Sequence, residues 1–156
     1  MDSVAGMQLS RFTDLGLRAM MRLAVSEAAE ARVTTRLIAR QVDASEHHIA
    51  KAVTRLVELG LVRSHRGRTG GLFITPAGRA ISVGRLVREL ERDREVVACT
   101  GIRPCPLVAA CRLRLALADA QEAFYRELDR YTLEDLVSGP AIGLLHVLAP
   151  PRAVAN

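Results

Sequence analysis

Residues 34–60 read TTRLIARQVDASEHHIAKAVTRLVELG, and this stretch decides the fold. Thr34 and Ser45 are favourable N-caps, because a hydroxyl oxygen can accept a hydrogen bond from the free N–H groups of a first helical turn. Each of them predicts a short helix behind it, and Gly60 is a typical C′ glycine for the end of the second. Two short helices joined by a tight turn at 43–45 are typical of a helix-turn-helix.

The second of these helices has an apolar face and a polar face. The apolar residues recur at helical spacing and are expected to point into the core: Ile49, Ala52, Val53, Leu56 and Leu59. The opposite face carries His47, His48, Lys51, Thr54, Arg55 and Glu58. A polar face is usual for any surface helix. Here the preceding helix and the basic balance of the chain favour contact with DNA.

Residues 61–74, LVRSHRGRTGGLFI, predict a β-hairpin. The strand at 61–65 alternates, and the turn at 66–71 is rich in glycine, which tolerates positive φ. A hairpin directly after a helix-turn-helix defines a winged helix. Its tip carries Arg66 and Arg68, and a slim tip with guanidinium groups can enter a minor groove, where the negative potential attracts arginine.

The charge distribution supports binding to nucleic acid. The chain of 156 residues has a net charge of +5, and all of this excess lies before the first cysteine. A basic first part joined to a neutral second part suggests that the first part binds DNA. The residues expected to contact DNA are Thr34, Thr35, Arg36, Ser45, His47, His48, Lys51, Arg55, Arg66 and Arg68.

The segments on either side of the winged helix also predict helices. Ser10 or Thr13 can cap a first helix that is expected to run to about Ala29. Asp14 falls in its first turn, and from spacing alone it is a surface carboxylate that offsets the helix dipole. Behind the hairpin, Thr75 and the proline after it predict the start of a helix. It is expected to continue to residue 90 with a slight break at residue 84.

A long helix is predicted for the second part of the chain. Its apolar stripe spans about five turns and consists of Leu113, Leu117, Ala120, Phe124 and Leu128. A stripe of this length needs a partner surface, and a second copy of the chain would give a two-fold dimer suited to a two-fold operator. Thr132 and Asp135 are spaced as a capping box for a last short helix, 133–137.

Between these parts lie the only cysteines of the chain, Cys99, Cys105 and Cys111, at equal intervals. Pro104 and Pro106 flank the middle one, which predicts a loop. Three thiolates in one loop favour a shared soft metal centre, such as zinc, copper(I) or an iron–sulfur cluster. Buried, purely structural thiols are the ordinary alternative. An odd number of cysteines and the lack of a signal peptide argue against a disulfide framework.

The expected organisation is mainly α. It consists of a winged-helix DNA-binding domain at 1–94, a cysteine loop at 95–111, a dimerisation helix with a short terminal helix at 112–137, and a tail at 138–156. No segment has the length and composition of a membrane span or signal peptide, so the protein is expected in the cytoplasm. No phosphate loop, nucleophile–base set or dinucleotide fingerprint argues for an enzyme. An electron-transfer protein would not need a helix-turn-helix and wing.

From Leu9 to about Val137 the chain resembles the Rrf2 family of bacterial winged-helix regulators. The motifs that carry the resemblance are FTDLGLR at 12–18, GRTGGL at 67–72 and the cysteines at 99, 105 and 111. The resemblance implies a homodimer with an iron–sulfur cluster in each subunit, bound by these cysteines.

Two branches of that family differ in the fourth cluster ligand. One adds a histidine three places after the last cysteine, where this chain has Arg114, which cannot ligate iron. The nitric-oxide-sensing branch takes an aspartate in the first helix of the other subunit, and Asp14 occupies the matching position. The runs at 83–90 and 119–125 are also similar to actinobacterial members of that branch.

The second branch implies a 4Fe-4S cluster and a repressor whose loaded dimer binds a palindromic operator until nitric oxide releases it. Two alternatives remain open. The first is a redox-responsive or iron-responsive regulator with a 2Fe-2S cluster. The second is a DNA-binding regulator with a structural zinc, for which His65 or His146 would be the fourth ligand.

Overall fold

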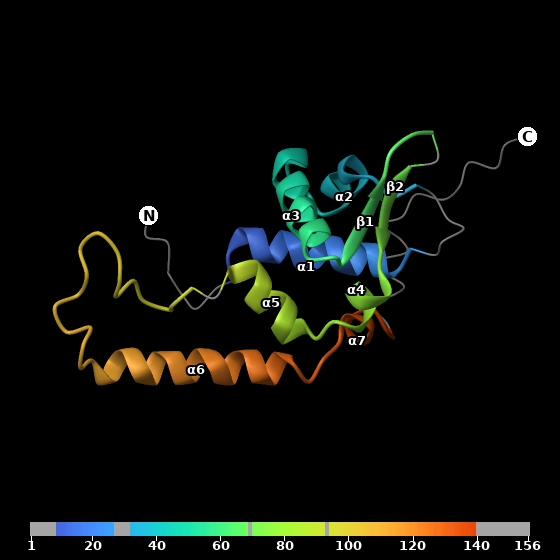
Figure 1. The fold of residues 1–156 in the computed structure, drawn as a ribbon. Helices are drawn as coiled ribbons and strands as arrows, with labels where there is room; N and C mark the ends of the chain where they lie inside the picture. Colours follow the sequence, from blue (N-terminus) through green and yellow to red (C-terminus); the bar gives the residue numbers. More distant parts are fainter. Residues whose placement is uncertain (1–8, 27–31, 69, 93, 140–156) are drawn as a thin grey trace, which may run out of the picture.

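The computed structural model describes residues 9–26, 32–68, 70–92 and 94–139 (Figure 1). The elements in chain order are α1 (Arg11–Ala24), α2 (Thr35–Gln41), α3 (Glu46–Glu58), β1 (Val62–His65), β2 (Gly71–Ile74), α4 (Pro76–Ala80), α5 (Val83–Glu91), α6 (Arg112–Leu128) and α7 (Leu133–Leu136). Most of them form one body, while the first half of α6 and the loop before it extend beyond that body. The predicted winged helix is confirmed.

The two predicted caps determine where α2 and α3 begin. The Thr34 hydroxyl accepts a hydrogen bond from the Leu37 amide at 3.2 Å, and the Ser45 hydroxyl accepts one from the His48 amide at 3.2 Å. The turn between the helices places Asp43 in the left-handed region with φ of 51°. Aspartate tolerates this conformation better than most residues. The helix-turn-helix geometry therefore follows from local chemistry.

The wing is a two-stranded antiparallel hairpin. Its register pairs Val62 with Ile74 and His65 with Gly71. Val62 is buried, whereas the other residues of β1 are exposed. In β2, Gly71 and Leu72 are buried and the Leu72 amide donates to the Val33 carbonyl at 2.8 Å, so the hairpin packs on the body along β2, while residues 66–68 at its tip are exposed.

One hydrophobic core joins α1, α2, α3, the hairpin, α5 and α7. Its fully buried members include Met20, Ile38 and Leu56, and Leu133 of α7 is equally buried. Val137, behind α7, belongs to the same core. Residues from both sides of the cysteine loop thus complete a single core. The predicted division into four segments remains a prediction.

The helix predicted behind the hairpin is in fact two helices, so this prediction is wrong in its extent. Ile81 has extended backbone angles, and the Ser82 hydroxyl caps α5 by accepting from the Arg85 amide at 3.2 Å. The break occurs here because Ile81 and Ser82 pair with the segment before α7: the Leu133 amide donates to the Ile81 carbonyl at 3.1 Å. Helix α1 is also shorter than expected, since it ends at Ala24.

The second half of α6 is docked against α5. Gly84 of α5 lies so close to α6 that an added Cβ would come within 2.2 Å of the Tyr125 carbonyl oxygen. Arg88 donates to both oxygens of Glu122, at 2.7 and 3.1 Å, and its guanidinium lies 4.4 Å from the Tyr125 ring centroid. Gly84 is therefore a close-contact position, and Tyr125 is the buried residue of α6 that the predicted stripe omitted.

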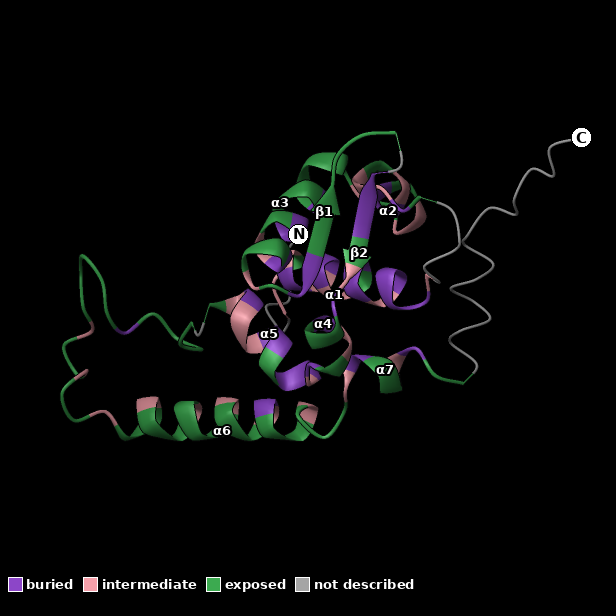
Figure 2. Cartoon of the chain, turned by 45° about the vertical axis from the view of Figure 1, so that its right-hand side comes forward, coloured by how far each residue is buried: buried purple, intermediate pink, exposed green. Residues whose placement is uncertain are grey.

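The first half of α6 has little cover within the chain (Figure 2). Leu113 is 65% exposed and Leu115 is 67% exposed. Apolar side chains this exposed on a helix are typical of a contact surface. Within the described ranges, no helix combines the length and the apolar character that a membrane span requires.

Candidate nucleic-acid interface and cysteine loop

The predicted DNA-contacting elements lie together. Helices α2 and α3 and the tip of the hairpin lie on the side of the body opposite to α6 (Figures 1 and 2). The cysteine loop lies beyond the free end of α6, away from this surface. The chain therefore places its DNA-binding and thiol-bearing parts at separate ends.

The polar face of α3 is largely available to a ligand. His47, His48 and Lys51 are exposed, and His48 Nδ1 lies 2.7 Å from the Ser45 hydroxyl. This contact orients His48 at the start of the helix, which is where a recognition helix reads base edges. Thr54 is exposed but its hydroxyl donates to the Ala50 carbonyl at 2.9 Å.

The phosphate-binding candidates at the start of α2 differ in exposure and in the contacts that they already make. Arg36 is exposed and forms a 3.4 Å ion pair with Glu46 of α3. Thr35 is half-buried, and the hydroxyl of Thr34 already serves as the cap of α2. An exposed ion pair of this length is weak and would yield readily to a phosphate.

At the wing, Arg66 and Arg68 are both exposed. The ring of His65 packs edge-on against Phe73 across the hairpin, with centroids 5.3 Å apart. This contact stiffens the hairpin just below its tip. It also engages His65 on the wing, far from the cysteine loop (Figure 1). A zinc site that combines this histidine with the loop of the same chain is therefore not formed, and His146 lies outside the described residues.

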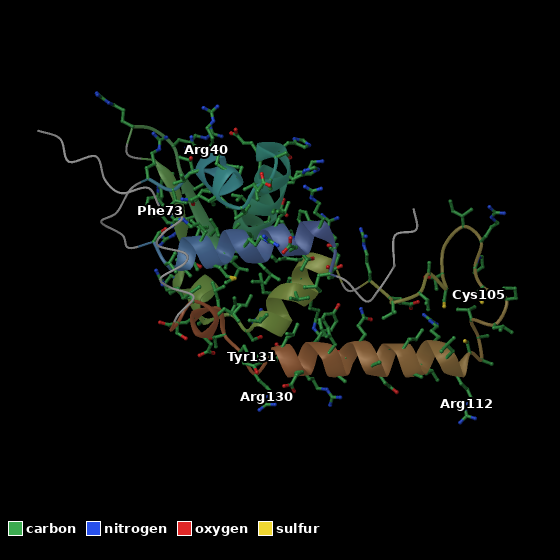
Figure 3. All side chains as sticks on the ribbon, turned by 180° about the vertical axis from the view of Figure 1, so that it is seen from behind. Arg40, Phe73, Cys105, Arg112, Arg130 and Tyr131 are labelled. Carbon is green, nitrogen blue, oxygen red and sulfur yellow. The ribbon has the colours of Figure 1, made fainter. Side chains whose placement is uncertain are left out.

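Three arginines near this surface were missed by pattern reasoning. Arg32, Arg40 and Arg63 are exposed on the approach to α2, on α2 and on β1. Figure 3 shows Arg40 pointing outward from α2 on the side that bears α3 and the hairpin. Positive charge was the only signal that could have identified them, since no spacing rule does so.

Arg55 is the exception among the predicted contacts, because its side chain is already engaged. Only 27% of it is exposed, and its guanidinium pairs with Glu89 of α5 at 3.3 Å and with Glu58 at 3.5 Å. Its Nε is buried and has no hydrogen-bond partner among the described residues. The charge of Arg55 is therefore partly neutralised within the chain by Glu89, and its predicted contact with DNA would have to displace this pair.

We therefore expect Glu89→Gln to strengthen DNA binding. The released guanidinium can neutralise one more phosphate, which should steepen the slope of log K against log salt by about one and raise affinity at low salt roughly three- to fivefold. Electrophoretic mobility at several salt concentrations measures both. Glu134→Gln, at an exposed position of α7, controls for the change in net charge. An equal gain in an Arg55→Gln background would contradict this interpretation.

The cysteine loop is exposed except at its first thiol. Cys99 is buried, whereas Cys105 and Cys111 are half-buried, and all three are free thiols. The Cys105 amide donates to the Cys99 carbonyl at 3.1 Å, and Cys111 serves as the N-cap of α6. Figure 3 shows Cys105 on the loop beyond the end of α6. A backbone hydrogen bond therefore links Cys105 to Cys99, whereas Cys111 is held at the start of α6.

The thiols influence one another electrostatically. Burial raises the pKa of Cys99, and the negative charge of Cys105 and of Glu95 raises it further, while Arg114 opposes them. The structure does not bring the three sulfurs together as ligands: no group of three or more His, Cys, Asp or Glu among the described residues has metal-binding geometry. Three neighbouring thiols nevertheless fit an iron–sulfur centre in donor chemistry.

Asp14 lies on the exposed surface of α1. Its carboxylate accepts from Arg18 Nε at 2.8 Å, as an i,i+4 pair on the helix surface. Its side chain is 45% exposed and so accessible to another subunit. Within one chain it behaves as a surface carboxylate, and its role as a ligand to a second subunit's cluster remains a proposal.

A helix-turn-helix, an arginine-tipped wing and a separate thiol loop define a winged-helix transcription regulator. The chain belongs to the Rrf2 family, described as iron-dependent transcriptional regulators, which it matches over residues 9–139.

Two curated relatives are similar over most of their length. The HTH-type transcriptional repressor NsrR of Streptomyces coelicolor is 56% identical over 134 residues, covering 86% of this chain and 90% of that protein. The HTH-type transcriptional regulator NsrR of Geobacillus kaustophilus is 39% identical over 137 residues, covering 86% and 92%. The predicted resemblance is confirmed, and the relatives are regulators, not enzymes.

Solved structures confirm the fold. CymR, the global cysteine regulator of B. subtilis, has a TM-score of 0.64 at 29% identity, covering 85% of this chain and 98% of that chain. IscR of T. potens has a TM-score of 0.64 at 25% identity, covering 86% and 89%.

Proposed function

We propose that this transcriptional repressor senses nitric oxide through an iron–sulfur cluster. The observation that carries the proposal is the combination of a winged helix with a separate loop that carries three free thiols. The 56% identity to a repressor named NsrR supports the same reading. When bound, the cluster supplies iron sites with which nitric oxide can react.

Cys99, Cys105 and Cys111 would hold the cluster, with Asp14 of the partner subunit as the fourth ligand of a 4Fe-4S centre. A carboxylate oxygen is a hard ligand and a poor match for soft iron–sulfide, so the bond from Asp14 would be the weakest of the four. Helix α1, which carries Asp14, shares one hydrophobic core with α2 and α3 of the helix-turn-helix. Loss of that bond could therefore change how the two recognition helices are spaced.

The repressor is proposed to act as a homodimer on a palindromic operator in the cytoplasm. The exposed leucines of α6 provide the apolar surface for a second copy. A two-fold dimer presents two recognition helices to two half-sites, and its symmetry matches that of a palindrome.

The decisive experiment compares three states of the full-length protein on one duplex. The duplex is selected from a random-sequence pool by anaerobically reconstituted protein. Reconstituted protein is expected to shift it, whereas nitrosylated and cluster-free protein should not. Iron and sulfide counting separates a 4Fe-4S centre from a 2Fe-2S centre. A colourless preparation with equal affinity would refute the proposal, and a metal assay would then show whether the loop holds zinc.

The role of Asp14 has its own test. We expect Asp14→Ala to accelerate cluster loss or alter the reaction with nitric oxide about tenfold, because ligand and outer-shell changes at metal sites typically cost 10–100-fold. Stopped-flow absorbance measures the reaction. Arg18→Ala is the matched control, since it breaks the 2.8 Å ion pair but keeps the carboxylate. Identical behaviour of the two variants would remove Asp14 from the ligand set.

A further inference from the structure

The root of the cysteine loop is fastened to α6 at two points. The Arg114 guanidinium makes a forked ion pair with the Glu95 carboxylate, with Nε 3.3 Å from Oε2 and Nη2 bonded to Oε1. Two turns further along α6, Gln121 Nε2 donates a hydrogen bond to the Arg94 carbonyl at 2.6 Å. Arg114 and Gln121 are seven residues apart and share one face of α6. The chain at 94–97 therefore lies along this face.

Arg114 also contacts Cys111 through its backbone. Its amide donates to Cys111 Sγ at 3.4 Å, which makes the thiol the cap of the helix. Its guanidinium lies close enough to Cys99 and Cys111 for their negative charges to raise the pKa of Arg114, after the larger effect of Glu95. The Arg114 side chain thus interacts electrostatically with both the first and the last thiol of the loop.

We propose that the Arg114–Glu95 pair is a clasp that closes the base of the cysteine loop and positions Cys99 and Cys111 for a shared cluster. The proposal rests on the proposed function and adds two positioning residues to it. From the sequence, Arg114 was notable only as a residue that cannot ligate iron. In the structure, its two-point ion pair with Glu95 makes it a positioning residue for the loop.

The physical advantage is preorganisation. Residues 95 and 114 are 19 positions apart. Without the ion pair, the entropic cost of bringing the two ends of this loop together would have to be met when the cysteines bind a cluster. A forked arginine–carboxylate pair fixes both distance and orientation, which a single-point contact does not. Cys99 is buried while its sequence neighbours are exposed, and this is consistent with a loop whose root is held in place.

A different role for the same pair would be electrostatic tuning of the cluster by one positive and one negative charge. The two roles predict different outcomes. Removal of either partner opens a clasp, so Arg114→Gln and Glu95→Gln should act in the same direction. If the pair tunes the cluster electrostatically, Arg114→Gln removes a positive charge and Glu95→Gln removes a negative one, so the two variants should change the rate of iron loss in opposite directions. The double variant of a clasp should be no worse than either single variant.

The experiment uses both variants, the double variant and Arg112→Gln as a matched control. Arg112 precedes Arg114 by two residues and points away from the body (Figure 3). In reconstituted protein, the rate of iron loss to a chelator should rise about tenfold in all three clasp variants, as for other outer-shell partners. Equal rates in the clasp variants and the control, or opposite effects of the single variants, would overturn the proposal.

A second measurement needs no cluster. In cluster-free protein, alkylation of Cys99 by a small maleimide, followed by mass spectrometry, should be slower than that of Cys105. It should accelerate several-fold in the clasp variants, whereas Arg112→Gln should leave it unchanged. If wild-type protein takes up no iron, the proposed function fails and this measurement alone decides the clasp. Unchanged Cys99 reactivity in the clasp variants would reject it.

Discussion

Cys105→Ser is expected to abolish cluster binding and high-affinity recognition of the operator. Two thiolates and a weakly bound carboxylate do not retain an iron–sulfur centre, which normally has four protein ligands. The visible absorbance should vanish after reconstitution. Operator affinity should fall by about 100-fold, towards the non-specific binding that remains when specific contacts are lost. Anaerobic absorbance spectra and mobility shifts measure the two effects.

Cys105 is the most informative of the three cysteines to replace. It is only partly buried, whereas Cys99 is buried and Cys111 caps α6, so replacement of either would also disturb structure. Thr100→Ala, an exposed change in the same loop, is the matched control. If the serine variant still bound a full complement of iron, the assignment of the loop as the cluster site would be wrong.

Gly84→Ala is expected to cause a large loss of stability through a single added methyl group. The new Cβ would lie 2.2 Å from the Tyr125 carbonyl oxygen and 2.5 Å from Asp129 Oδ1. Asp129 accepts a hydrogen bond from the Arg85 amide at 2.9 Å, so its displacement would also remove one of the two acceptors of this amide at the start of α5, the other being the Ser82 hydroxyl. Overpacking at such a contact costs about 2–3 kcal/mol. At this chain length the melting temperature should fall by about 5–10 °C.

Calorimetry or circular dichroism melting tests this expectation. Arg85→Ala changes the exposed face of the same helix and should alter the free energy of unfolding by less than about 0.5 kcal/mol. A melting temperature for Gly84→Ala within a degree of wild type would show that α5 and α6 can separate without cost. The close approach of the two helices would then not be a stabilising contact.

The parts of the fold that the sequence predicted are those determined by local chemistry. Hydroxyl caps at Thr34 and Ser45 and the capping box of Thr132 with Asp135 are all present. The end of the helix behind Pro76 was missed because a distant segment determines it. Ile81 leaves the helix to pair with residues 131–133, and no spacing rule within residues 76–90 encodes this partner.

The candidate site shows the same limit. Arginine and histidine content identified the exposed face of α3, but the pairing of Arg55 with Glu89 depends on how α5 packs. The cysteine spacing identified a loop, whereas the role of Arg114 emerged only once Glu95 was seen beside it. Interactions between helices of different sequence position are invisible to periodicity.

The arrangement of the core around the cysteine loop has an evolutionary consequence. Leu133 and Val137 return to the core that α1 and α3 share, so the loop is an excursion from a folding unit that closes behind it. Such an excursion can gain, lose or exchange residues with little penalty to the rest of the chain. Substitutions at a few exposed loop positions can accordingly change the signal to which a regulator responds, while its DNA-binding helices stay the same.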